Sequence, residues 1–114
     1  MAILANTQFN MSGIAHRANG TLSAEDVDVD FPAVITKTLG FAPKYIRVVH
    51  VTDRIIHEWF EGMEVGDYIE EVAAGDKTLE TDDLLSVTAD GFTITQASNP
   101  TISDDDLTVW EAFG

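Results

Sequence analysis

The chain is 114 residues long and carries 20 acidic against 6 basic side chains, a formal net charge of −14. This length fits one domain with one core. The acidic excess repels the phosphates of nucleic acids and of anionic membranes, so neither is expected as a partner. The absence of cysteine excludes disulfides, thiolate catalysis and thiolate metal sites. The N-terminus lacks the basic segment and apolar core of a signal peptide, and no stretch approaches transmembrane length, which predicts a soluble protein made in the cytoplasm.

Residues 1–21 are small and polar, with asparagines and glycines between scattered apolar residues. We interpret them as an extended N-terminal arm or a first irregular strand, and residues 22–114 as the main domain. An arm of this kind often docks on a neighbouring subunit, although a frayed terminus has the same appearance in sequence.

Strict alternation marks the next element, Asp26–Phe31, in which apolar side chains face one way and three aspartates the other. This pattern predicts a half-buried strand. Three carboxylates on one face are able to bind Ca²⁺, but this ion prefers a curved loop with about six or more oxygens, so a solvated strand face is favoured. After Pro32, the β-branched residues of 33–39 fit either a further strand or a connection.

The central stretch follows a Gly/Pro turn and contains two runs rich in β-branched and aromatic residues, 45–51 and 55–60, separated by a short turn. This predicts a β-hairpin. Both runs are apolar on both faces, which is typical of strands in the middle of a layered fold. His50 and His57 flank the turn, but a metal site there needs a third and a fourth ligand, so packed or surface histidines are favoured.

The segment 61–75 has helical spacing of apolar residues and also fits a strand, and its β context favours the strand. After it, strands are predicted at 84–88, 92–96 and 107–113. The turn at Ala89-Asp90-Gly91 is expected because Asp-Gly favours a positive φ. Short strands at this spacing predict an all-β fold, an antiparallel β-sandwich or a jelly-roll-like barrel.

Chemical signatures are missing from the sequence: no phosphate loop, dinucleotide fingerprint, nucleophile elbow, HExxH motif or EF-hand loop occurs. The acidic run 104–106 lacks the glycine and the terminal glutamate of a calcium loop, so a solvated turn is favoured. We therefore expect no catalytic residue, no cofactor and no metal site, and a protein that is not an enzyme.

Two parts of the chain carry a resemblance: 40–63, with its Gly-Phe-Ala-Pro-Lys opening, and the closing segments 90–95 and 107–114. Together they resemble small tailed-bacteriophage virion proteins of β-sandwich type, and they cover 38 of the 114 residues, one third of the chain. The resemblance implies a structural protein of the virion, made in the host cytoplasm. We expect a capsid decoration (cement) protein that binds the major capsid protein, as a homo-oligomer such as a trimer or as a monomer at capsid symmetry positions. Two alternatives stay open: a tail, fibre or adaptor module that binds host glycan or bridges tail proteins, and a small lectin-like or carbohydrate-acting protein unconnected with phage.

Candidate site residues follow from this resemblance. Lys44, Arg47 and Arg54 are candidates for pairing with acidic residues of a partner, although solvated roles are common for such side chains. Trp59 and Trp110 are candidates for stacking on sugars in the tail-module alternative. Each tryptophan lies in an apolar strand, so a place in the core is expected for both.

Overall fold

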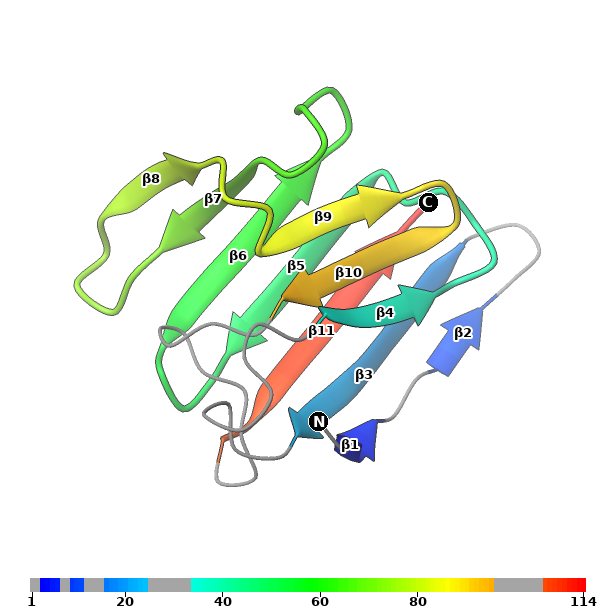
Figure 1. The fold of residues 1–114 in the computed structure, drawn as a ribbon, viewed down its shortest axis with the longest axis horizontal. Helices are drawn as coiled ribbons and strands as arrows, with labels where there is room; N and C mark the ends of the chain where they lie inside the picture. Colours follow the sequence, from blue (N-terminus) through cyan, green and yellow to red (C-terminus); the bar gives the residue numbers. More distant parts are fainter. Residues whose placement is uncertain (1–2, 7–8, 12–15, 25–33, 96–105) are drawn as a thin grey trace.

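The computed structural model describes residues 3–6, 9–11, 16–24, 34–95 and 106–114, and it is an all-β sandwich of two antiparallel sheets (Figure 1). The predicted fold class is confirmed. The strands are as short as the sequence spacing indicated, and every pairing between them is antiparallel.

The large sheet places the last strand of the chain in its middle, between the third and the fifth. Its strands, in spatial order, are β1 (Ile3–Asn6), β3 (Arg17–Ala24), β11 (Thr108–Phe113), β5 (Tyr45–His50), β6 (Ile55–Phe60), β7 (Tyr68–Glu71) and β8 (Lys77–Glu80). A further strand, β2 (Phe9–Met11), pairs with β3 beside β1. Residues 1–21 therefore contribute strands to one side of this sheet.

The small sheet consists of β4 (Val34–Thr38), β10 (Gly91–Thr95) and β9 (Leu85–Thr88), with β10 in the middle. It lies across one face of the large sheet (Figure 1). We call the face that it covers the inner face and the opposite one the outer face. The strand at 34–38 settles the choice left open for 33–39.

The core lies between the two sheets, because alternate side chains of each central strand point inward. In β5 and β11 every second residue is buried, and the intervening ones are half-buried. Phe92 of β10 meets Trp110 of β11 edge to face, with ring centroids 5.3 Å apart. Trp59 and Trp110 are only 6% and 2% exposed, so the expectation that both belong to the core is confirmed.

Four further segments differ in how they compare with the sequence predictions. The stretch 61–75 contains β7 and no helix, as its context favoured. The strand Lys77–Glu80 was not predicted, because its four residues have no apolar alternation and three of them are exposed. The predicted strand Asp26–Phe31 and residues 104 and 105 of the acidic run lie outside the described residues.

Gly91 begins β10, and its role differs from the expected one. Its φ is not positive. A Cβ at this position would instead lie 1.9 Å from the carbonyl oxygen of Lys37 on the neighbouring strand. The glycine is therefore needed for the close approach of β10 to β4 and not for the turn.

We predict that Gly91→Ala lowers the free energy of unfolding by about 3 kcal/mol, because the new methyl group must displace backbone in a packed sheet. Gly40→Ala is the matched control: no atom lies within 4 Å of a Cβ there, and only the positive φ of 83° is strained, at a cost of about 1 kcal/mol. Urea unfolding of the two variants measures both effects, and equal losses would contradict this role of Gly91.

Candidate functional site

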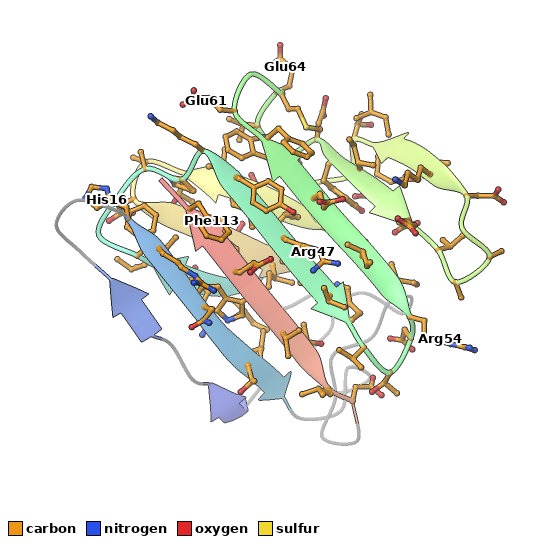
Figure 2. The ribbon with its side chains drawn as sticks, turned by 180° about the vertical axis from the view of Figure 1, so that it is seen from behind. His16, Arg47, Arg54, Glu61, Glu64 and Phe113 are labelled. Atoms are coloured by element: carbon orange, nitrogen blue, oxygen red, sulfur yellow. The ribbon has the colours of Figure 1, made fainter. Side chains whose placement is uncertain are left out.

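The outer face of the large sheet carries three rows of side chains that run across β6, β5 and β11 (Figure 2). Each row takes one residue from each strand, because the register aligns them. The aromatic row is Phe60, Tyr45 and Phe113; the charged row is Glu58, Arg47 and Glu111; the aliphatic row is Ile56, Val49 and Val109. On β3 the rows continue with Arg17, Asn19 and Thr21.

The aromatic row forms a continuous contact. The ring of Tyr45 lies 5.1 Å from that of Phe60 and 6.0 Å from that of Phe113, measured between centroids. The guanidinium carbon of Arg17 lies 5.5 Å from the centre of the Phe113 ring, a cation–π distance. Phe60 is nevertheless 44% exposed. The row thus presents a large apolar side chain to solvent.

The charged row alternates in sign. Arg47 lies between the two glutamates, with its Nη1 3.9 Å from Oε1 of Glu111. The hydroxyl of Tyr45 donates a 2.5 Å hydrogen bond to Oε2 of Glu58. Burial and this bond to a carboxylate both raise the pKa of Tyr45, so the phenol stays protonated. The row is therefore held in place by contacts along the sheet.

The aliphatic row leads into a shallow hollow of about 260 Å³ at the turn between β5 and β6. Most of its lining is apolar, from Val49, Val51, Ile56, Val72 and Ala73, and Arg54 and Glu71 complete it. Val51 is 41% exposed. The hollow continues the apolar surface of the outer face toward β7.

The sequence predicted burial on both faces of the central strands, and the structure corrects this. The small sheet covers the inner face, whereas no described element covers the outer face. Its residues in β5 are half-buried by their lateral neighbours alone. The apolar residues of the outer face are therefore partly in contact with water in the single chain.

The outer face also differs from the rest of the chain in charge. Its strands carry three bases (Arg17, Arg47 and Lys77) and three acids (Glu58, Glu71 and Glu111), which sum to zero. The chain as a whole carries −14. A neutral, partly apolar face on a strongly acidic protein is typical of a protein-binding surface.

The three predicted partner-binding residues do not form one patch. Lys44 precedes β5, where its backbone N–H donates to the carbonyl of Phe113 and its carbonyl accepts from Glu61. Arg47 lies in the middle of β5, within the charged row. Arg54 lies beyond the other end of β5, exposed, in the turn to β6, with a positive φ of 57° (Figure 2). Arg47 belongs to the charged row and Arg54 lines the hollow at one end of the outer face, whereas Lys44 lies beyond the other end of β5.

The two histidines that flank the turn do lie together, on the inner face. The rings of His50 and His57 are 5.0 Å apart, and each residue is 2% exposed. Nε2 of His57 lies 2.8 Å from Oε2 of Glu70, and the His57 ring packs against Tyr68 at 4.3 Å. Neither ring nitrogen of His50 has a hydrogen-bond partner among the described residues.

Burial controls the titration of this pair. It lowers the pKa of His50 to about 3, with a smaller contribution from the neighbouring His57, while Asp53 acts in the opposite direction. It also lowers the pKa of His57 to about 4, against the field of Asp82 and Glu80. Both rings are therefore neutral at neutral pH. Burial likewise raises the pKa of Glu70.

This buried cluster offers no surface for chemistry. No group of three or more metal-binding side chains occurs among the described residues. Since His57 is almost fully buried, a substrate has no path to its ring in this conformation. The cluster acts as part of the core, and the outer face is the stronger candidate for the functional surface.

Lys37, in β4 of the small sheet, is a further buried polar residue that the sequence did not single out. It is 3% exposed, and its ammonium nitrogen lies 5.6 Å from the centre of the Trp110 ring. Burial lowers the pKa of Lys37. The alternation in Val34–Thr38, with Ile35 and Lys37 on the same side, was the available signal.

Comparisons of the chain with protein-family models, with curated proteins and with solved structures found no significant match. The resemblance to phage virion proteins therefore stays a prediction. No membrane-spanning helix is found in the part of the chain that the structure describes.

We predict that the protein loses stability when the pH falls from about 7.5 to about 5.5, and that His50 alone accounts for about 1.4 kcal/mol of the loss. The sign follows from its pKa, which is lower in the folded state than in the unfolded one. Its contribution is complete above the unfolded value of 6.5 and is lost as the pH falls toward the folded value of about 3, because only the unfolded chain takes up the proton.

His50→Leu removes the titrating group at similar volume, so the difference in unfolding free energy between the two pH values should shrink by that amount. The parent protein, measured in parallel at both pH values, is the reference. Urea unfolding at both pH values measures the effect. An unchanged difference in the His50 variant would contradict the assignment.

Proposed function

We propose that this protein is a non-enzymatic structural protein of a tailed-phage virion. In this proposal it is a capsid decoration protein that binds the outer shell and stabilises it through protein–protein contacts. Its partners are the major capsid protein and further copies of itself. The proposal joins the resemblance of 40–63 and the closing segments to the properties of the outer face.

The observation that supports it is the outer face itself. The central strands carry apolar side chains on both faces, and one of these faces is open, neutral and ordered into rows. Strands of this kind are buried on both sides in stable folds. A protein whose fold leaves such a face open is built for assembly, which is the work of a decoration protein. Many small contacts, repeated over a shell, add up to a large stabilisation.

Acidic charge supports the same proposal. A net charge of −14 keeps the free protein soluble at the high concentrations needed before assembly. The exposed bases near the ends of β5, Lys44 and Arg54, lie outside the charged row and are suited to acidic residues of the shell. Their contributions are those of exposed ion pairs, roughly 0.2–1 kcal/mol each.

A tail or fibre module that binds host glycan is the second candidate. The aromatic row favours it, because sugar faces stack on exposed aromatic rings. Trp59 and Trp110 no longer support it, since both are buried. If this candidate is correct, glycan-array binding will be lost in Phe60→Ala while the fold stays intact.

Co-sedimentation with mature capsids that lack the protein tests the proposed function. We expect saturable binding at high copy number. The double variant Lys44→Glu/Arg54→Glu should weaken binding by about tenfold, because two attractive rim pairs become repulsive. Thr78→Glu adds an acid on the side of β8 opposite to the outer face, and this control should bind as the parent does.

Absence of binding by the folded parent protein would contradict the decoration role and favour the tail module. Equal binding by the double variant and the parent would instead remove Lys44 and Arg54 from the interface and leave the role itself intact.

A further inference from the structure

We infer that the outer face pairs with the outer face of a second copy, about a two-fold axis that runs parallel to the strands between β5 and β11. This inference rests on the proposed assembly function and names the partner of the outer face. In place of the trimer expected from the resemblance, such a contact makes a two-fold dimer, in which the same surface serves both copies.

The charge of the outer face favours a second copy of the chain as its partner. Two chains that each carry −14 repel one another over most of their surfaces. The outer face is an exception, because its strand residues sum to zero. Two copies that approach through it bring no excess of like charge into contact, and the acidic remainder stays in solvent.

The order of charges across the sheet selects the axis. Rotation about an axis between β5 and β11 lays β5 of one copy over β11 of the other. Arg47 then faces Glu111 of the second copy, and Glu111 faces its Arg47, so the pair forms twice. Glu58 of β6 falls opposite the uncharged Asn19 of β3. No two like charges meet along the charged row.

The other two rows match under the same rotation. Tyr45 falls opposite Phe113, and the exposed Phe60 falls opposite Arg17, which already contacts an aromatic ring within its own chain. Val49 falls opposite Val109. Packed sheets lie about 10 Å apart, which leaves room for these side chains to interdigitate. Each row, whether aromatic, charged or aliphatic, therefore lies opposite the same row of the second copy.

The perpendicular axis is the alternative, and the charged row disfavours it. Rotation about an axis parallel to the rows places each strand over the same strand of the second copy. Arg47 would then face Arg47, and both glutamates would face themselves. Like charges opposite one another at an interface cost several kcal/mol.

Charge reversal tests the inference, with mass in solution measured by sedimentation equilibrium. The parent protein should be a dimer. Arg47→Glu places a carboxylate opposite Glu111 of the second copy, and Glu111→Arg places a guanidinium opposite its Arg47, so each variant should weaken dimerisation by about 100-fold or more. An equimolar mixture of the two variants should regain the dimer, because each mixed pair joins opposite charges at both positions.

The mixture is the decisive arm, because a variant that merely loses fold or stability is not rescued by a differently charged partner. Thr78→Glu is the control: Thr78 is exposed on β8, on the side opposite to the outer face and outside the four strands that overlap, and the variant should stay dimeric. Circular dichroism of each variant shows whether it is folded. A monomeric parent protein, or folded variants that gain nothing on mixing, would overturn the inference.

Thiol cross-linking gives an independent readout, since the chain has no cysteine of its own. A mixture of Val49→Cys and Val109→Cys chains should react with a short bis-maleimide, because these residues share a row. A mixture of Val49→Cys and Phe113→Cys chains should react far less, because their rows lie apart along the strands. The reverse preference would overturn the axis.

The outcomes also separate this inference from the proposed function. A monomer that binds capsids would overturn the dimer and leave the decoration role standing, with the shell as occupant of the outer face. A dimer that binds no capsid would overturn the role and leave the pairing standing.

Discussion

The central strands of this protein carry apolar side chains on both faces, and a three-stranded sheet covers only one of them. The contact between Phe92 and Trp110 ties the two sheets together, and Ile46, Val48 and Ala112 pack around it. The hydrophobic effect also favours covering the apolar side chains on the opposite side of β5 and β11, which are only half-buried. No described element covers that side, and the proposed association would remove its apolar side chains from water. The antiparallel register aligns the side chains of neighbouring strands, and this alignment produces the three rows on the outer face.

The space between the two sheets shows what burial does to polar groups. His50 and His57 of the large sheet stay neutral because burial lowers their pKa values, and Lys37 of the small sheet packs over the ring of Trp110. On the outer face, charged groups are accommodated differently. The charged row alternates in sign, so each charge lies beside an opposite charge. Such a row tolerates water in the free chain and suits a partner with the same alternation. The two faces of one sheet are thus adapted to different surroundings.

Much of the fold follows from local pattern. The hairpin of β5 and β6, the closing strand and the all-β class were predicted, because alternation and β-branched residues act within a few positions. Lys77–Glu80 escaped prediction, since its pairing with β7 and not its own composition makes it a strand. The positive φ predicted for Gly91 was wrong for a related reason. The carbonyl oxygen that excludes a Cβ at this position belongs to Lys37, which is far away in the sequence. The rows of the outer face needed the same long-range register, which places β11 beside β5. The sequence did show that the central strands are apolar on both faces. This pattern predicts that both faces are buried, but it does not identify what covers each face. Of the three predicted site residues, Arg47 lies within the outer face and Arg54 lines the hollow at its end, while Lys44 lies outside both.

The central claim is that the outer face is covered when the protein assembles. Hydroxyl-radical footprinting of the purified chain at low and at high concentration tests it directly, with oxidation of each residue read by mass spectrometry. The account predicts that Phe60 and Phe113 lose most of their oxidation at high concentration, while Val65, exposed and away from this face, keeps its own. Unchanged oxidation of the aromatic row at every concentration would contradict it.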